Sequence, residues 1–190
     1  NRVFFTKTGA LLFGPQDLLP FQTDVLLSEH VGGVTLRRFE GLNLMELVSR
    51  VLKDLEFLWR NIKEYPNIRD DNGNPFIYRK YPRTAIQEAL VNFIIHRDYN
   101  AQEAHIDIHE SHVVFTNPGA CPYDPDVFLE EDLNKPPYPR NEVIIQIFSR
   151  TKLSQRQRRG LWHIKQSLIQ NGNIDNEQKP LLWITNYKEN

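Results

Sequence analysis

Three polar side chains recur at four-residue spacing between Tyr81 and Tyr99: Glu88, Asn92 and His96. On an α-helix, residues four apart lie nearly above one another, about 6 Å apart along the axis. The three side chains therefore form one polar stripe on a helix. We expect this stripe at the edge of the apolar helix face, half-buried and directed across a sheet, where a ligand can bind.

The stripe carries residue types that suit phosphoryl transfer. A carboxylate such as that of Glu88 can polarise a water molecule for attack on a terminal phosphate. The amide oxygen of Asn92 can bind Mg²⁺ without adding negative charge, and the metal then offsets the charge of the phosphate oxygens. The alternative is that both are ordinary boundary residues of an amphipathic helix, because the bare E-x-x-x-N spacing is common.

Composition restricts the class of protein. The 190 residues, 40% of them hydrophobic and 25% charged, suit one globular domain, or one domain and a small subdomain. The net charge of −1 gives no overall attraction to nucleic acid or to an acidic membrane. Cys121 is the only cysteine, so neither an intrachain disulfide nor a cysteine zinc site can form. No apolar run reaches the roughly 20 residues that span a bilayer. We expect a cytoplasmic fragment of a longer protein.

Apolar periodicity and turn residues predict the elements of the first half. We expect strands at residues 9–14, 23–29 and 34–39, with Gly32 and Gly33 forming the turn between the last two. Helical periodicity begins at Leu44 and should end at Pro66. The polar segment 67–75 is then a loop, which separates an N-terminal strand, hairpin and helix subdomain (1–66) from the main domain (76–190).

The second half should contain a strand at 76–79 and then the helix with the stripe. Pro82 at its first turn, or a capping box of Thr84 and Gln87, marks its start. Further expectations are a hairpin of 104–110 and 113–116, a loop over 118–139 with a short helix near 125–133, helices at 141–150 and 160–170, and a strand at 181–185. This order predicts an α+β fold, with a mixed or antiparallel sheet and helices on one face.

The longer string around the stripe, YPRTAIQEALVNFIIHRDY at residues 81–99, resembles a known family. It is similar to the divergent GHKL (histidine-kinase-type) ATPase domain of bacterial RecG-related transcriptional regulators. Three further segments match in order: TGALLFG at 8–14, VFTNPG at 114–119, and Arg140-Asn141 before Val143-Ile144. Together they span about residues 8–165. The resemblance implies a Bergerat-like α/β sandwich that binds Mg–ATP.

The resemblance also assigns roles to individual residues. Glu88 matches the general base, and Asn92 matches the Mg²⁺ ligand. Asn117 and Gly119 match the segment that reads adenine, and Gly160 matches the glycine-rich segment that approaches the phosphates. His96 and Arg97 lie close to the stripe and could reach the phosphates; alternatively, Arg97 pairs with Asp98 at the helix end.

Two positions depart from the family pattern. Asn117 stands where an acid is expected, and Trp162 replaces the second glycine after Gly160, with no Glu before it. Two functions follow: an ATP-binding regulatory domain of a transcriptional regulator, with at most weak ATPase activity, or a dimerisation or scaffold module that binds no nucleotide. Space left open at Trp162 would favour ATP, and a space filled by the indole would favour the scaffold.

Partners follow from the same resemblance. Full-length members carry a Schlafen or AlbA-type nucleic-acid-binding domain before this one and often a winged helix after it, so DNA contacts are expected outside this fragment, and a homodimer is expected within it. A weaker alternative is direct nucleic-acid binding through the basic segment Arg150–Arg159. The alternation of His105, Asp107 and His109 favours an exposed strand face over a metal site.

Overall fold

The protein has an α+β fold, as the sequence predicts. The structure, a computed structural model, describes residues 6–60, 62–69, 75–79, 81–101, 104–109, 112–119, 140–151, 153 and 160–171, with the backbone alone described for 62–69 and 75–79. The elements are α1 (Lys7–Phe13), η1 (Gln16–Leu18), β1 (Val25–Glu29), β2 (Thr35–Phe39), α2 (Leu44–Asp54), α3 (Phe57–Arg60), β3 (Ile62–Arg69), β4 (Pro75–Arg79), α4 (Arg83–His96), β5 (Ala104–Ile108), β6 (Val113–Thr116), α5 (Glu142–Arg150) and α6 (Gly160–Gln170).

Strands from two separate segments of the chain form one mixed sheet. Its order is β2-β1-β5-β6, and β3 pairs with β4 in a separate two-stranded sheet. β1 runs parallel to β5, from Val25 opposite Ala104 to Glu29 opposite Ile108, whereas the other two pairs are antiparallel. The division into 1–66 and 76–190 stays a prediction. In the structure, both segments contribute strands to this sheet and side chains to one core.

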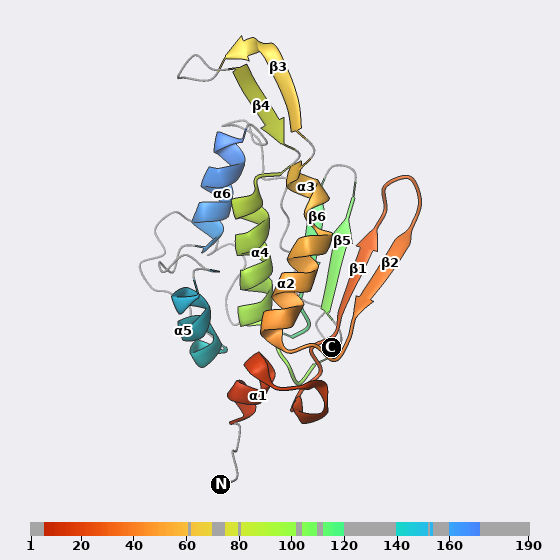
Figure 1. The fold of residues 1–190 in the computed structure, drawn as a ribbon, viewed down its shortest axis with the longest axis vertical. Coiled ribbons are helices and arrows are strands. Elements are labelled where there is room, and N and C mark those ends of the chain that lie inside the picture. The colour runs from red at the N-terminus through yellow and green to blue at the C-terminus, as the bar shows by residue number, and fades with distance from the viewer. Residues whose placement is uncertain are drawn as a thin grey trace.

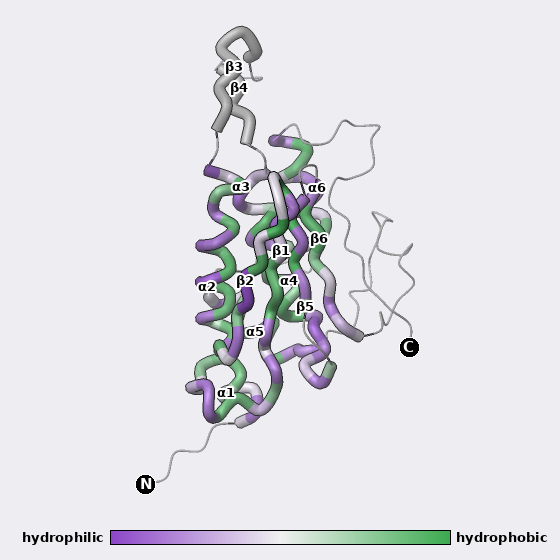
Figure 2. Tube along the Cα trace, turned by 90° about the vertical axis from the view of Figure 1, so that its right-hand side faces the viewer, coloured by the Kyte–Doolittle hydropathy of each residue, from purple (hydrophilic) through white to green (hydrophobic). Residues whose placement is uncertain are grey.

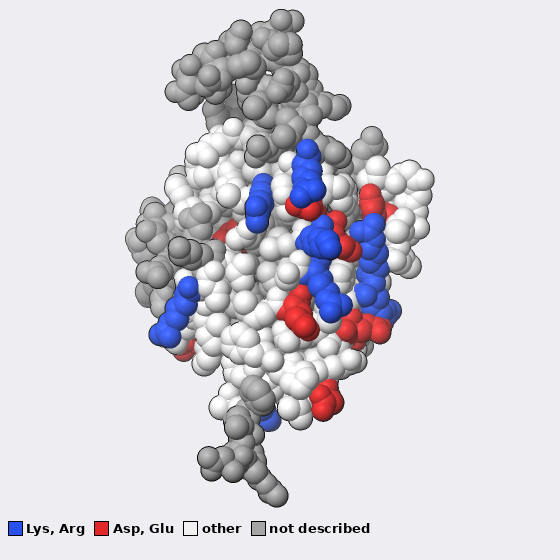
Figure 3. Space-filling view, in the orientation of Figure 1, with Lys and Arg blue, Asp and Glu red and all other residues white. Residues whose placement is uncertain are grey.

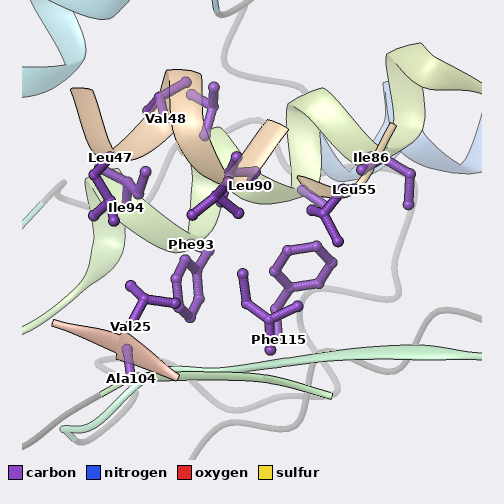
Figure 4. Packing of buried hydrophobic residues seen from close by; sticks show 14 of the residues in the cluster. Val25, Leu47, Val48, Leu55, Ile86, Leu90, Phe93, Ile94, Ala104 and Phe115 are labelled. Atoms are coloured by element: carbon purple, nitrogen blue, oxygen red, sulfur yellow. The ribbon is translucent and has the colours of Figure 1, made fainter. Parts of the chain in front are cut away.

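The helices gather on one face of this sheet, as Figure 1 shows. Alternate strand residues are buried on that face, which is the pattern of a half-buried sheet. Phe93 of α4 meets Phe115 of β6 edge to face, with ring centroids 5.7 Å apart. Figure 4 shows this layer, with Leu47, Val48 and Leu90 of the helices above Val25 and Ala104 of the sheet.

Helix α4 lies in the centre of the molecule and is buried on nearly all sides. The sheet, α2, α5 and α6 all pack against it. By contrast, α2 alternates between hydrophilic and hydrophobic residues along its length, as expected for a surface helix (Figure 2). The stripe on α4 therefore faces a neighbouring helix, and it is not directed across the sheet as expected from sequence.

The predicted strand at residues 9–14 is wrong, because this segment is helix α1. The Thr6 hydroxyl accepts a hydrogen bond from the N–H of Gly9 (3.0 Å), which caps the first turn. Gly14 ends the helix in tight contact, since a Cβ atom at this position would lie 2.5 Å from the Ala10 carbonyl oxygen. The two glycines that suggested a short strand therefore belong to a helix and its end.

The helix predicted from Leu44 to Pro66 is also too long. Helix α2 ends at Asp54, α3 follows it, and the chain then forms β3, which covers Pro66 and part of the predicted 67–75 loop. The pairing of β3 with β4 is interrupted between Tyr65 and Arg69. Proline is tolerated at such an irregularity because its missing N–H interrupts no regular ladder.

The other described elements agree with the sequence. Gly32 and Gly33 form the β1–β2 turn with φ angles of 72° and 143°, and the β5–β6 hairpin, α5 and α6 are all present. Pro82 precedes α4 without a side-chain cap, and Thr84 donates to Ser167 Oγ (3.1 Å), so the start signal from Pro82 is the better one. The expected elements at 125–133 and 181–185 lie outside the described residues.

Charged side chains of both signs are interspersed over the face formed by α2 and β2 (Figure 3). Arg37 lies 3.3 Å from Asp54, and Arg60 lies 2.7 Å from Glu56 within α3 and the turn before it. Exposed pairs of this kind contribute about 0–1 kcal/mol each to stability. Within the described residues, no helix has the length and apolar character needed to cross a membrane.

Three imidazole rings stack where β1 and β5 end and β6 begins. The His30 and His109 centroids are 4.6 Å apart with nearly parallel rings, and those of His109 and His112 are 4.4 Å apart. His30 Nε2 also lies 3.3 Å from Asp107 Oδ1. Desolvation, and then the charges of His112 and His30, lower the pKa of His109, while Asp107 acts in the opposite direction. In the described part of the chain, no group of three or more His, Cys, Asp or Glu side chains could hold a metal ion.

Acid should destabilise this stack. A histidine whose pKa is lowered by folding binds a proton more weakly in the folded chain than in the unfolded one, so the free energy of unfolding decreases as the pH falls below 6.5, the ordinary pKa of the group. Urea denaturation at about pH 7.5 and about pH 5.5 measures the difference. This difference in the free energy of unfolding should be smaller in His112→Asn than in the wild type. It should be unchanged in His105→Asn, a control on the same strand face as His109. Equal pH dependence in all three proteins would contradict the stacking argument.

Candidate functional site

Helix α6 covers two residues of the polar stripe of α4, Glu88 and Asn92, whereas His96 stays exposed. A Cβ atom placed on Gly160, the first residue of α6, would lie 2.5 Å from Asn92 Nδ2 and 2.8 Å from Glu88 Oε1. The backbone of Gly160 is therefore in direct contact with both side chains. Further along, Thr84 is hydrogen-bonded to Ser167, so α6 runs antiparallel to α4. The structure thus brings together three of the residues singled out in the sequence.

The environment of Glu88 and Asn92 is unusual for a carboxylate and an amide. Glu88 is buried and Asn92 is half-buried. Both side chains lie at the first turn of α6, where backbone N–H groups have no partner within the helix and the helix dipole is positive. Such a helix end favours a carboxylate or another anion. The contact therefore combines a metal-binding amide, a carboxylate and an anion-binding helix end.

The indole of Trp162 does not fill this space. Its side chain is 44% exposed at the surface of α6, where its ring meets that of His163 at a centroid distance of 5.0 Å. Nε2 of His163 is buried, without a hydrogen-bond partner in the described part of the protein. What lies directly against Glu88 and Asn92 is the Gly160 backbone. The sequence led us to expect either an open space or a space filled by the Trp162 indole. The structure shows neither, because the Gly160 backbone occupies the space.

Asn117 contacts the C-terminal end of α4. Its Nδ2 donates to the carbonyl oxygen of Phe93 at 2.6 Å. A carbonyl oxygen can only accept, so the amide nitrogen must face it, and Oδ1 must point the other way. Oδ1 is buried and has no hydrogen-bond partner within the described residues. An acid at this position could not donate to Phe93 when ionised, which gives a physical reason for Asn in place of the expected acid.

Two more side chains complete this helix end. The Tyr99 hydroxyl donates to the carbonyl of Ile94 at 2.8 Å, and Asn141 Nδ2 donates to the carbonyls of Ile95 and Arg97, both at 2.9 Å. The Ile94 carbonyl also accepts from the backbone N–H of Arg97 (3.4 Å), and the carbonyls at a helix end otherwise depend on such side-chain donors. Burial raises the pKa of Tyr99, with the charge of Arg97 opposing it, so the phenol stays protonated and keeps donating.

Arg97 lies in the core and not beside Gly160. Its side chain is only 1% exposed, its Nη1 donates to the Thr23 carbonyl at 3.1 Å, and its guanidinium lies 5.4 Å from the centre of the Tyr99 ring. This arrangement attaches the end of α4 to the segment before β1. The structure therefore separates Arg97 from the stripe, although the sequence places it five residues after Asn92.

Asp98 and Gly119 lie against Arg140. Arg140 Nη1 lies 3.6 Å from Asp98 Oδ2, and a Cβ atom on Gly119 would lie 2.8 Å from the same Nη1. Gly119 has a φ of +101°, which an L side chain rarely adopts. His96 keeps an exposed face, but surrounding protein displaces water from the ring and lowers its pKa, and the Arg140 charge lowers it further.

Sequence reasoning missed Arg140, Asn141 and Tyr99 as contributors. Their only signal was their place in segments that resemble the family, which said nothing about capping. Asn141 acts on a carbonyl 46 residues away in the chain, and no local pattern reveals such a contact. Of the basic segment Arg150–Arg159, Arg150 is exposed at the end of α5. Residues 152 and 154–159 lie outside the described part.

A cavity of about 400 Å³ lies elsewhere, before β1. Asp24 in its wall already accepts hydrogen bonds from the Gly41 N–H (3.2 Å) and the Gln22 amide (2.9 Å). Its lining contains none of the residues of the stripe, so the cavity and the contact at Gly160 are separate features. The lining residues are Gln16, Leu19, Phe21, Gln22, Thr23, Asp24, Glu40 and Gly41.

Comparison with known proteins supports an ATPase-like family. Residues 102–182, less than half of the chain, match the model of the family described as "Putative ATP-dependent DNA helicase recG C-terminal". No curated protein matches the chain. Among solved structures, the DIP2311 protein from Corynebacterium diphtheriae is similar, with a TM-score of 0.66 and 20% identity over 86% of this chain. The chain spans 32% of the length of that protein, and the likeness shows the fold alone.

Replacing Gly160 tests the contact with the stripe. An alanine favours a helix over glycine by about 1 kcal/mol, so an uncrowded site would gain stability. Because its Cβ would press on Asn92 and Glu88, we expect Gly160→Ala to lose about 1–3 kcal/mol in urea denaturation. The loss should shrink in the Asn92→Ala background, where the nearest atom is absent. A Gly160→Ala protein as stable as the wild type would refute this packing.

Replacing Asn117 by the expected acid tests the cap. Ionised aspartate cannot donate to the Phe93 carbonyl and adds negative charge at the negative end of α4, so Asn117→Asp should lose about 1–3 kcal/mol near pH 7. The deficit relative to wild type should shrink at about pH 4, where a protonated carboxyl can donate. Urea denaturation of both proteins at both pH values measures this deficit in the free energy of unfolding. An unchanged deficit would show that the lost hydrogen bond is not the cause.

Proposed function

We propose that the chain is an ATP-binding regulatory domain, with Mg–ATP bound where α6 begins beside Asn92. The observation that carries the proposal is the contact of Gly160 with Glu88 and Asn92. A carboxylate, a metal-binding amide and an anion-binding helix end meet there. The ATPase-like family match covers α6 and the strand before Asn117, and it supports the same function.

Each residue has a chemical task in this proposal. The amide oxygen of Asn92 would hold Mg²⁺, which offsets the phosphate charge when bound. The N–H groups at the start of α6 would donate to phosphate oxygens. Glu88 would polarise a water molecule for hydrolysis. The orphaned Oδ1 of Asn117 fits the amino group of adenine, which donates hydrogen bonds.

Any ATPase activity should be weak. Gly160 lies directly against Glu88 and Asn92, so a metal or phosphate must displace it before reaction. Trp162 stands where the family pattern has a second glycine, and its first-turn backbone is less free to approach phosphates. We therefore propose that binding, more than turnover, is the biological activity of this site.

The wider role is proposed from the resemblance stated above. We propose that nucleotide binding in this GHKL-type, RecG-related domain changes the conformation or dimerisation of attached Schlafen or AlbA-type DNA-binding domains. Such domains would lie outside these 190 residues, in a cytoplasmic protein.

One observation favours a second function. Because the Gly160 backbone occupies the space beside Asn92, the same packing suits a dimerisation or scaffold module that binds no nucleotide. Binding distinguishes the two functions directly. Direct nucleic-acid binding through Arg150–Arg159 stays a weaker proposal, which would be salt-sensitive and lost on charge reversal at Arg156 and Arg158.

Calorimetric titration with Mg–ATP tests the proposal. We expect Asn92→Ala to weaken Mg–ATP binding about tenfold or more, because it removes the metal ligand. Glu88→Gln should keep most of the affinity but abolish hydrolysis, because the amide cannot act as a base. Gln146→Ala, which removes an exposed amide from α5, is the matched control and should bind like the wild type.

The outcomes separate the two functions. Equal affinity of the wild type and Asn92→Ala would refute the metal-ligand assignment. A wild-type protein that binds no Mg–ATP while remaining folded would refute the ATP-binding domain and favour the scaffold module.

A further inference from the structure

Strand β2 forms one edge of the four-stranded sheet. In the order β2-β1-β5-β6 its only strand partner among the described residues is β1, and Figure 1 shows it at one margin of the molecule. Residues 35–38 of this strand are all exposed. An edge strand carries unpaired backbone N–H and C=O groups, which can pair with another strand. The free side of β2 is therefore a surface to which a further strand can bind.

Two backbone hydrogen bonds show which way the groups of β1 point. The N–H of His30 donates to the carbonyl of Ile108 (2.8 Å), and the N–H of Ala104 donates to the carbonyl of Asp24 (3.4 Å). Both contacts join residues that flank β1 to its parallel neighbour β5 or the strand's continuation. Because backbone groups alternate in direction along a strand, the even-numbered residues of β1 bond to β5 and the odd-numbered ones bond to β2.

The same alternation fixes the free edge of β2. Thr35 lies opposite Glu29, and Arg37 lies opposite Leu27, so Thr35 and Arg37 exchange their hydrogen bonds with β1. The N–H and C=O groups of Leu36, between them, then point away from β1. The pairing of β1 with β2 runs through its whole length without a register shift. The free edge is therefore regular, without the bulge that protects many natural edge strands.

Exposed apolar side chains line this edge. Val34 is 68% exposed and Leu36 is 61% exposed, and Val31 in the preceding turn is exposed as well. Natural edge strands are commonly protected by charged side chains, Lys above all, or by Pro. Strand β2 contains neither Lys nor Pro.

The two arginines of β2 are held by acids of their own chain. Arg37 Nη1 lies 3.3 Å from Asp54 Oδ2, and Arg38 Nε lies 3.4 Å from Glu40 Oε1. These acids offset positive charge that would otherwise repel a second copy of the same strand. The edge therefore combines apolar side chains with locally balanced charge, which suits pairing of β2 with itself.

A second copy of β2 fits this edge in one antiparallel register. Because the outward groups belong to even-numbered residues in both copies, the two-fold axis must pass through a residue. An axis at either arginine would place like charges directly opposite each other, which is destabilising. An axis at Thr35 or Phe39 runs into Gly33 (φ 143°) or Gly41 (φ 61°), whose positive φ angles end the extended strand. An axis at Leu36 avoids both faults and allows about six backbone hydrogen bonds.

We propose that the chain pairs with a second copy of itself through β2, in antiparallel fashion about a two-fold axis at Leu36. The two sheets then form one continuous sheet across the dimer. The inference goes beyond the ATP site because it needs no nucleotide, and it names the surface through which a dimerisation module would act. A single strand edge makes a small interface, below about 1,200 Å², so the dimer should be weak and concentration-dependent.

Sedimentation equilibrium of the chain without nucleotide tests the pairing. The wild type should change from monomer to dimer between about 10 μM and about 1 mM, the range expected of a weak interface. Leu36→Lys places like charges on the axis and should weaken association about tenfold or more. Val143→Lys is the matched control, because Val143 is 52% exposed on α5, away from β2, and this variant should associate like the wild type.

A second pair of variants separates backbone pairing from side-chain contact. Leu36→Pro removes an N–H that points outward, so the β1–β2 hairpin keeps its own hydrogen bonds while the dimer loses about two at its centre. Leu36→Ala removes the same side chain but keeps the N–H. Leu36→Pro should therefore associate more weakly than Leu36→Ala. Circular dichroism checks that each variant is folded, and Leu36→Lys and Leu36→Ala carry the comparison with the wild type if the proline variant is not.

Each outcome bears on the inference. A wild type that stays monomeric up to about 1 mM refutes it and leaves the proposed ATP site unaffected. Association that is equal in the wild type and Leu36→Lys places the dimer on another surface and also refutes it. Equal association of folded Leu36→Pro and Leu36→Ala shows that strand pairing is not the contact. A dimer that dissociates as expected in Leu36→Lys supports the inference even if the wild type binds no Mg–ATP.

Discussion

The structure depends on burying α4 on nearly all sides. A helix in that position leaves its last carbonyl groups without water, and each unsatisfied group would reduce stability by about 1–3 kcal/mol. Tyr99, Asn117 and Asn141 satisfy these carbonyls from three separate parts of the chain. The loop after β6 and the start of α5 are therefore fixed by one requirement, the completion of a buried helix end.

That requirement also assembles the candidate site. Because Asn117 must present its nitrogen to Phe93, its oxygen is left facing away without a partner. Because Asn141 is attached to the helix end, Arg140 is held over Gly119 and beside Asp98. Asn117, which the sequence marks as a binding residue, therefore caps α4, and only its remaining oxygen is available to the proposed ligand.

The sequence predicts what is local. The α+β class, the β1–β2 and β5–β6 hairpins, and the shared helix face of Glu88 and Asn92 all follow from patterns within a few residues. The same logic failed at α1, where a cap at Thr6 outweighed two flanking glycines, and at β3, where an irregular ladder tolerated Pro66. The covering of the stripe by Gly160 joins residues about 70 positions apart, and the inward turn of Arg97 depends on Thr23. Such contacts are set by tertiary packing, which no periodicity encodes.

The position of α6 links the two functions considered above. Its N-terminus lies against Asn92, while Ser167 is attached to Thr84 at the opposite end of the contact. A metal or phosphate at Asn92 must displace Gly160, and a helix held at Ser167 can respond by moving its first turn. Occupancy of the site and the position of Trp162, exposed on that turn, are then coupled. A ligand can shift such an equilibrium only by as much as it binds one position better than the other. The proposed weak ATP site and the proposed surface that changes with nucleotide therefore rest on the same helix contact.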